Sequence, residues 1–388
     1  MYKIKMLNKI SNIGIETLDK GKYTVAEDAS NPDAILVRSA DMHDYSFNPE
    51  LLCIARAGAG TNNIPSDRCR EEGIVVFNTP GANANAVKEI VICALFLASR
   101  DILGGIEWVK KLESDIDVSQ AVEKGKSAYV GPEISGKTLG VVGLGAIGAK
   151  IANAVTSLGM KVYGYDPYLS VDAAWNLSSD IIHATDLETI YKNCDYITLH
   201  VPYMEATHHL INESALGMMK NGVRIINIAR GELVNDDDMI AAINSGKVAR
   251  YVTDFPNNKI VNVEGIIAIP HLGASTPESE DNCAVMAARE VIEYIENGNI
   301  INSVNMPSAS MPRTGDPRLC VIHKNVPDMI SQITGAVSAC GINIENMLHS
   351  AEKNMPYSYM MMDVHSVADG LTETIKAIEG VVRVRVLN

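Results

Sequence analysis

Short apolar runs alternate with stretches of helical period along most of the chain. Runs rich in Val, Ile and Ala at residues 34–38, 53–57 and 74–78 are typical of buried strands. Between residues 85 and 100 the apolar side chains instead recur every three or four positions, which predicts a helix with one apolar face. Strands and helices that alternate in this way predict a parallel sheet covered by helices.

A second alternating block begins at Thr138 and ends near His271. Its predicted strands occupy residues 138–142, 162–166, 196–201, 223–228, 251–254 and 266–269, and a helix over residues 277–296 follows. With 388 residues, the chain is too long for one ordinary core, so we expect two or three domains.

The last part of the chain has a different texture. Residues 303–317, SVNMPSASMPRTGDP, are rich in Pro and Ser and lack a periodic apolar face, which indicates a linker. Residues 318–388 then predict strands at 319–323, 342–350, 357–365 and 381–387, with helices at 327–340 and 371–378. This βαββαβ order is that of a small ferredoxin-like domain.

Composition narrows the class of protein. The chain is 47% hydrophobic and 21% charged, which is typical of a globular protein, and its apolar runs are far shorter than the roughly 20 residues of a membrane span. Its N-terminus lacks the apolar block of a signal peptide, so we expect a cytoplasmic protein whose seven cysteines are thiols. The cysteines form no CxxC pair, so we expect no metal site. The net charge of −14 argues against a nucleic-acid-binding surface. An anionic substrate would therefore need a few local cations.

Residues 138–148, TLGVVGLGAIG, carry the strongest chemical signal. A strand leads into a GxGxxG turn, and an apolar helix follows. Gly143 allows the tight turn, Gly145 lets the backbone approach a pyrophosphate, and Gly148 allows close packing of helix and sheet. Ala146 and Ile147 complete the loop at the start of the helix, where free N–H groups attract phosphate. Asp166 ends the next strand, where an acid would bind the adenine-side ribose, so we favour NAD over NADP.

These residues, with six further motifs in order, resemble the D-isomer-specific 2-hydroxyacid dehydrogenase family over nearly the whole chain. The motifs are LVRSA at 36–40, ARAGAG at 55–60, NTPG at 78–81, HVP at 200–202, NIARGE at 227–232 and PHLGAS at 270–275. The resemblance implies a Rossmann-like cofactor domain inserted in a flavodoxin-like substrate domain, with the active site in the cleft. We assign residues 1–100 and 284–312 to the substrate domain, 101–283 to the NAD-binding domain, 313–317 to the linker and 318–388 to a regulatory domain.

Two catalytic residues follow. Arg230 comes after a buried strand, where its guanidinium suits a carboxylate, and His271 follows another, where an imidazole can exchange the C2 hydroxyl proton. The family orients this histidine with a glutamate, but this chain has Asn258 or Lys259 at the corresponding place. Glu278 and Glu280 are alternative carboxylates. By resemblance Asp254 contacts the nicotinamide.

The resemblance also implies the remaining binding residues. The cofactor residues that it adds are Val201, Pro202, Thr207, Ile228 and Ala229. The substrate residues are Arg56, Ala57, Gly58 and Arg38, with Lys88 as an extra cation or, equally, a solvated lysine.

Residues 318–388 resemble an ACT domain, a module that binds amino acids, often at a dimer interface. His323, Asn325 and Asn343 match positions that bind serine as a feedback effector. This tail favours 3-phosphoglycerate as the substrate, oxidised to 3-phosphohydroxypyruvate in L-serine biosynthesis by a homodimer or homotetramer. The alternatives are another 2-hydroxy acid, such as hydroxypyruvate, glyoxylate or D-lactate, and a non-catalytic NAD-binding scaffold.

Overall fold

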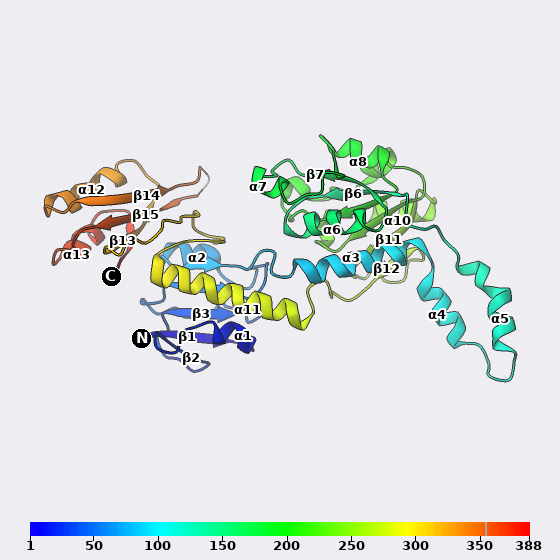
Figure 1. Cartoon of the computed structure of the whole chain (residues 1–388), viewed down its shortest axis with the longest axis horizontal. Helices are drawn as coiled ribbons and strands as arrows, with labels where there is room; N and C mark the ends of the chain where they lie inside the picture. The colour runs from blue at the N-terminus through cyan, green and yellow to red at the C-terminus, as the bar shows by residue number, and fades with distance from the viewer. Residues whose placement is uncertain (354) are drawn as a thin grey trace. The chain divides into compact units, whose positions relative to one another are not determined.

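The computed structural model describes residues 1–353 and 355–388, with the side chain of Asp172 left aside. The chain divides into two compact units, one of Met1–Asn83 with Pro277–Asn388 and one of Ala84–Thr276 (Figure 1). The second unit is therefore inserted into the first along the sequence.

The first unit contains a five-stranded parallel sheet in the order β2-β1-β3-β4-β5. This is the flavodoxin-like order that the sequence predicted. The strands are β1 Tyr2–Leu7, β2 Tyr23–Ala26, β3 Ala34–Val37, β4 Cys53–Arg56 and β5 Val75–Phe77. The helices are α1 Asn12–Glu16, α2 Ser66–Glu71 and α11 Pro277–Ile292, which continues into a π-helical turn η4 Glu293–Asn297. A Cβ at Gly14 would lie 2.5 Å from the Ala284 backbone, so only glycine lets α1 approach α11 so closely.

Two strands of this sheet escaped the sequence prediction. β1 lies inside the sheet, but Lys3 and Lys5 alternate with its apolar residues and only Ile4 is buried. β2 is the short edge strand beside it. Neither has the continuous Val and Ile run by which the buried strands were recognised.

Residues 303–311 are packed into the first unit, although the composition of residues 303–317 indicated a linker. The side chain of Asn305 is buried and replaces a missing strand partner, accepting from the Val76 N–H at 2.9 Å and donating to the Ile74 carbonyl at 2.9 Å. Met306 and Ala309 are buried in the same core. The segment is held by specific hydrogen bonds and not by a periodic apolar face. Its composition therefore did not predict that it would pack against the sheet.

The C-terminal part of the first unit forms a four-stranded antiparallel sheet in the order β14-β15-β13-β16. The strands are β13 Arg318–Lys324, β14 Ile344–Ser350, β15 Tyr357–Val364 and β16 Val381–Leu387, and the helices are α12 Met329–Ala339 and α13 Leu371–Lys376. The predicted βαββαβ order is confirmed. One face of this sheet packs on α12 and α13, while Cys320, Ile322 and Met361 on the other face join the core of the N-terminal sheet.

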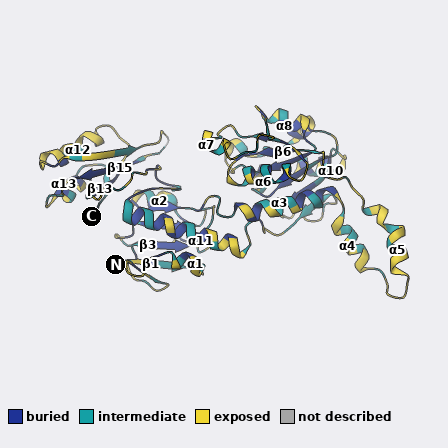
Figure 2. Cartoon of the chain, in the orientation of Figure 1, coloured by how far each residue is buried: buried dark blue, intermediate teal, exposed yellow. Residues whose placement is uncertain are grey.

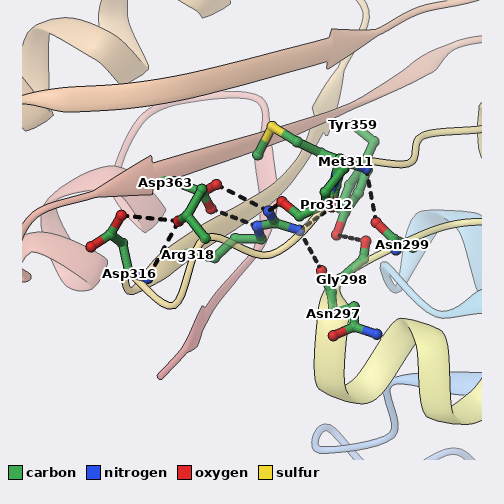
Figure 3. A network of polar contacts seen from close by, with 10 residues as sticks. Asn297, Gly298, Asn299, Met311, Pro312, Asp316, Arg318, Tyr359 and Asp363 are labelled. Atoms are coloured by element: carbon green, nitrogen blue, oxygen red, sulfur yellow. Dashed lines mark hydrogen bonds and ion pairs between the residues drawn. The ribbon is translucent and has the colours of Figure 1, made fainter.

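A buried arginine fixes this junction (Figure 3). Arg318 is fully buried, and its Nε and Nη2 donate to the two carboxylate oxygens of Asp363 at 2.6 and 3.0 Å. Its remaining N–H groups donate to the carbonyls of Asn297, Met311 and Pro312 at 2.7–2.8 Å. The guanidinium thus connects the C-terminal sheet, the end of η4 and the segment before β13.

The second unit contains a seven-stranded parallel sheet in the order β12-β11-β10-β9-β6-β7-β8. Its strands are β6 Thr138–Val142, β7 Lys161–Tyr165, β8 Ile182–His183, β9 Tyr196–Leu199, β10 Val223–Asn227, β11 Val248–Thr253 and β12 Ile266–Ala268. The order places β6 and β9 at the point where the chain reverses direction across the sheet, which is the Rossmann arrangement. The predicted fold class is confirmed.

Helices cover both faces of this sheet, and its strands are buried between them (Figure 2). The longer helices are α3 Ala84–Ser99, α6 Ala146–Thr156, α8 Leu187–Asn193, α9 Glu213–Met218 and α10 Asp236–Asn244; the short ones are α7 Val171–Ala174, η2 Glu205–Thr207 and η3 Gly231–Leu233. Helix α3 packs on α6 and on β10 and β11. The sequence analysis had assigned this helix to the substrate domain.

Residues 101–129 form two helices that the sequence analysis did not predict. They are α4 Ile102–Lys110 and α5 Val118–Gly125, followed by the turn η1 Lys126–Tyr129. Neither helix contains a buried residue. Trp108 stacks on Tyr129 with ring centroids 5.4 Å apart.

Candidate active site

The glycine turn joins β6 to α6 with little free space inside it. Gly143 has φ of 92°, and a Cβ there would lie 2.6 Å from the carbonyl oxygen of His200. A Cβ at Gly148 would lie 1.9 Å from the carbonyl oxygen of Gly143. Both positions require glycine, because any side chain would push the turn away from α6 and β9.

The outer side of the same turn is open and suits a dinucleotide. Gly145 is the N-cap of the 11-residue helix α6, and no side chain in the described part of the chain caps this end. A Cβ at Gly145 would meet nothing within 4 Å, so the backbone is accessible there. The N–H groups of Ala146, Ile147 and Gly148 therefore begin a helix whose partial positive charge suits a pyrophosphate.

Asp166 is held against this turn. It follows β7, and its Oδ2 accepts a hydrogen bond from the Leu144 N–H at 2.9 Å, while Oδ1 accepts from the Tyr168 N–H at 2.9 Å. The carboxylate is thus bonded to the backbone between Gly143 and Gly145, in the turn proposed to bind phosphate. This is where a dinucleotide-binding domain needs its ribose ligand.

The remaining cofactor candidates lie in the segments after β9 and β10. Thr207 Oγ1 donates to the Pro202 carbonyl at 2.7 Å and accepts from the Met204 N–H at 2.9 Å, which closes the turn that begins with Val201. Ile228 is buried, and Ala229 follows it. All five candidates therefore share the carboxyl edge of the sheet with the glycine turn.

Asn227, which the sequence pattern did not single out, shapes the turn that carries Arg230. The buried Asn227 accepts hydrogen bonds at Oδ1 from the Ala229 and Arg230 N–H groups, at 3.2 and 3.4 Å, and donates from Nδ2 to the Arg230 carbonyl at 2.8 Å. The exposed Arg230 guanidinium donates to the Ala229 carbonyl at 2.6 Å. An Asn directly after a buried strand is the signal that could have revealed this turn.

His271 lies in the turn after β12, and the Gly273 N–H of the same turn bonds to a buried carboxyl. The ring of Phe255 packs against its imidazole with centroids 4.7 Å apart and an interplanar angle of 54°. Asp254 is 1% exposed, and its Oδ2 accepts from the Gly273 N–H at 3.2 Å. Burial raises the pKa of Asp254 above its ordinary value of 3.8, while the charges of His271 and, more weakly, Arg230 lower it. The structure therefore brings Arg230, His271 and Asp254 into one electrostatic cluster.

The loop that lacks the family glutamate faces helix α10. Lys259 Nζ pairs with Asp237 at 2.8 Å, and Asn257 Nδ2 donates to Asp236 at 2.8 Å. These four residues, together with Phe255 and Glu232, line a cavity of about 420 Å³. Of the two alternative carboxylates, Glu280 pairs with Arg38 at 2.7 Å.

The predicted substrate cations lie in both units. In the first, Arg38 follows β3 and Arg56 ends the neighbouring β4, and Arg56 Nε donates to the Arg38 carbonyl at 3.0 Å. A Cβ at Gly58, which follows the buried Ala57, would lie 2.8 Å from Arg56 Nη1. In the second, Lys88 on α3 donates to Asn85 Oδ1 at 2.6 Å.

The predicted effector residues lie at two ends of the C-terminal sheet. His323 on β13 is opposite Ser358, and its Nε2 lies 3.2 Å from Nε2 of His349. Asn325 Nδ2 donates to the Met355 carbonyl at 3.1 Å. Asn343 precedes the other end of β14, where its N–H donates to His365 Nδ1 at 3.2 Å. One chain therefore brings His323 and Asn325 together, but not Asn343.

Other classes of site have no support among the described residues. No cluster of three or more His, Cys, Asp or Glu residues in these parts of the chain could hold a metal ion. The seven cysteines are free thiols. No helix described by the structure has the length and apolarity that crossing a membrane requires.

The fold and the glycine turn define a Rossmann-type dinucleotide-binding domain. Residues 93–273 match the D-isomer specific 2-hydroxyacid dehydrogenase, NAD binding domain. The chain is 33% identical over 278 residues to hydroxypyruvate reductase of Thermotoga maritima, covering 68% of this chain and 85% of that protein. It belongs to the D-isomer specific 2-hydroxyacid dehydrogenase family.

Two further relatives are named for 3-phosphoglycerate. D-3-phosphoglycerate dehydrogenase of Bacillus subtilis is 32% identical over 326 residues, which cover 79% of this chain and 60% of that protein. This chain thus matches less than two thirds of the length of that relative. The crystal structure of NAD+-bound 3-phosphoglycerate dehydrogenase from Entamoeba histolytica has a TM-score of 0.61 and 25% identity, covering 78% of this chain and 98% of that one.

Proposed function

We propose that this protein oxidises D-3-phosphoglycerate to 3-phosphohydroxypyruvate with NAD, the reaction that begins L-serine biosynthesis. The observation that carries the proposal is that Arg230 and His271 follow strands β10 and β12 of the unit that matches the NAD-binding domain, where the charges of both act on the buried Asp254. The names of the relatives from B. subtilis and E. histolytica support the choice of substrate.

In the proposed mechanism the protein binds the substrate carboxylate and moves one proton. The planar guanidinium of Arg230 binds the carboxylate by two parallel hydrogen bonds and polarises the C2 oxygen. His271, as neutral imidazole, accepts the C2 hydroxyl proton. NAD supplies the acceptor for the hydride that leaves C2. Gly143, Gly145, Ala146, Ile147 and Gly148 would hold its pyrophosphate.

The phosphate of the substrate requires further cations in a protein whose net charge is −14. We propose that Arg56 and Arg38 supply them, with Ala57 and Gly58 shaping the adjacent turn and Lys88 as an additional cation. Both arginines are half-buried, but Arg56 is oriented by its bond to the Arg38 carbonyl, whereas Arg38 is paired with Glu280, which favours Arg56.

The test is NADH formation by the purified chain from D-3-phosphoglycerate, beside D-lactate, with NADPH formation from NADP measured in parallel. In the reverse direction, NADH consumption is followed with 3-phosphohydroxypyruvate, hydroxypyruvate and glyoxylate. We expect the highest kcat/KM for the phosphorylated pair. Equal or higher kcat/KM for the unphosphorylated acids would overturn the choice of substrate.

The second candidate is reduction of hydroxypyruvate, which the T. maritima relative favours by its name. The same panel separates the two, because only 3-phosphoglycerate would need Arg56 and Arg38. Arg56→Gln should lower kcat/KM for the phosphorylated substrate and leave hydroxypyruvate reduction nearly unchanged. Loss of both activities would favour a general role of Arg56 in the pocket. No turnover with any acid would leave a non-catalytic NAD-binding scaffold.

We also propose that L-serine binds the C-terminal sheet through His323, Asn325 and Asn343, as in an ACT domain. Asn343 precedes the first residue of β14, whereas His323 on β13 lies beside His349 near the other end of β14. One serine could therefore contact all three residues only if two chains contribute. The proposal therefore includes a homodimer or homotetramer. Seven thiols suit a reducing cytoplasm. Calorimetric titration with serine tests the site, and sedimentation analysis tests the assembly.

A further inference from the structure

The turn that carries His271 is hydrogen-bonded to the side chain of Asp254. The Asp254 carboxyl is buried, and its Oδ2 accepts the Gly273 N–H two residues beyond the histidine. A Cβ at Gly273 would lie 3.1 Å from the same oxygen, so the carboxyl and the turn are in close contact. Glycine at 273 permits this approach. The Asp254 side chain therefore contacts the segment that sets the orientation of His271.

The other oxygen of this carboxyl still needs a donor. Among the described residues, Oδ1 of Asp254 is buried and has no hydrogen-bond partner. A buried carboxylate oxygen without a donor costs free energy, so a donor is expected when the site is assembled. His271 is the charged group with the strongest electrostatic effect on Asp254, ahead of Arg230. An imidazole N–H is a suitable donor.

The loop after Phe255 offers no carboxylate that could orient His271. Lys259 and Asn257 are bonded to Asp237 and Asp236 on α10. A glutamate is absent at both 258 and 259. Phe255 itself packs against the imidazole and restricts its rotation. Residues 254 and 255 thus contact the turn and the ring from one short segment.

We infer that Asp254 is the positioning residue for His271 and takes the place of the glutamate that this loop lacks. This inference rests on the proposed function. The ionised carboxylate orients the imidazole and stabilises the imidazolium that forms when His271 takes the C2 hydroxyl proton. Bound NAD would accept the hydride from C2, and His271 would then release its proton to solvent. The resemblance assigns Asp254 only to nicotinamide binding.

The test compares Asp254→Asn with Asp237→Asn, the same change at an exposed carboxyl that pairs with Lys259. For Asp254→Asn we expect kcat to fall by roughly 10- to 100-fold, with KM for NAD nearly unchanged. The acidic limb of kcat/KM for oxidation should move to lower pH, because the imidazolium loses its neighbouring charge. Asp237→Asn should leave both unchanged. A higher KM for NAD with normal kcat and pH profile would overturn the inference and leave only the cofactor contact.

A second measurement needs no substrate. The Cε1–H NMR resonance of His271, assigned with His271→Gln, is followed against pH in the wild type and in Asp254→Asn. The midpoint should move to lower pH by at least about half a unit in the variant. An unmoved midpoint overturns the inference even if the enzyme is active; a moved midpoint supports it even if the proposed substrate is wrong. Asp254→Ser, which keeps an acceptor for the Gly273 N–H, replaces Asp254→Asn if that variant does not fold.

Discussion

At the scale of single residues, the candidate chemistry depends on side chains placed by short turns at one edge of a sheet. Asn227 shapes the turn of Arg230 through backbone hydrogen bonds, and Asp254 supports that of His271. Each candidate catalytic side chain is thus exposed after a strand, Arg230 after the mostly buried β10 and His271 after the half-buried β12. Substitutions of the exposed residues Arg230 and His271 should lower the catalytic rate more than the stability of the fold.

His271→Ala should lower kcat by about two to four orders of magnitude, the range expected when a positioned acid–base is lost. NAD affinity should change little, because the phosphate-binding turn lies after another strand. Steady-state kinetics and NAD titration by fluorescence measure the two effects. Wild-type turnover in a folded variant would exclude His271 as the acid–base.

Arg230→Lys should lower kcat/KM for the hydroxy acid by at least about tenfold, or ~1.4 kcal/mol of transition-state binding. A lysine ammonium is a point charge and lacks the planar pair of donors that a carboxylate matches. Lys259→Arg on the neighbouring loop is the control and should be neutral. Unchanged efficiency of Arg230→Lys would mean that another group binds the carboxylate.

Asp166→Ala should reduce the preference for NAD over NADP, measured as the ratio of the two kcat/KM values. The carboxylate repels a ribose 2′-phosphate in the wild type, and its removal takes away this repulsion. Because Asp166 also accepts the Leu144 N–H, the variant should bind NAD more weakly as well. Equal use of both cofactors by the wild type would contradict the assignment.

At the scale of elements, helix α11 carries a buried acid that should make stability depend on pH. Glu290 is 5% exposed, and Asn302 donates to its Oε1 at 2.8 Å. Burial raises the pKa of Glu290 from its ordinary 4.5 to about 8. The folded state therefore holds a proton that the unfolded state releases between these pH values.

The sign follows from linkage. The stabilising effect of the protonated Glu290 is fully present below pH 4.5 and is lost as pH rises through about 8. Glu290→Gln mimics the protonated form, so it should be more stable than the wild type at pH 8, by up to about 1.4 kcal/mol per unit of pKa shift. Urea unfolding at pH 5 and pH 8 measures this. A variant with the same pH dependence as the wild type would contradict the prediction.

At the scale of the whole molecule, the first unit joins three distant parts of the sequence in one core. Tyr294 of η4, Cys53 of β4 and Cys320 of β13 belong to the same buried cluster. Arg383 and Arg385 of β16 donate to the Leu51 carbonyl at 2.7 Å and the Ile295 carbonyl at 3.0 Å. The C-terminal sheet therefore contributes to the stability of the N-terminal sheet, in addition to any regulatory role.

Arg318→Met should destabilise the first unit by about 3–5 kcal/mol, because Asp363 would stay buried without its counter-charge. Chemical denaturation measures the loss. The double variant Arg318→Met with Asp363→Leu should recover part of it, since no buried charge remains, although the three carbonyls bonded to Arg318 lose their donor. A double variant less stable than Arg318→Met would contradict this account.

The sequence by itself determined the local elements and the chemistry that a short motif encodes. The strand of residues 138–142 was predicted with its observed bounds, Gly143 was assigned the tight turn and Gly148 the close packing of the helix. The reason is physical, since apolar periodicity and glycine geometry depend on neighbours within a few residues. Arg230 and His271 were proposed in the same way, each after a predicted strand.

Only the tertiary structure decided which distant residues meet. Asn305 anchors residues 303–311 by hydrogen bonds, and Asn343 lies away from His323. Asp254 is hydrogen-bonded to the turn that carries His271. These contacts are hydrogen bonds and charge interactions between segments distant in sequence, and they leave no periodicity in the chain. Composition indicated a linker over residues 303–317, and the sequence left the carboxylate partner of His271 open, because a pattern records the burial of a residue and not the identity of its partner.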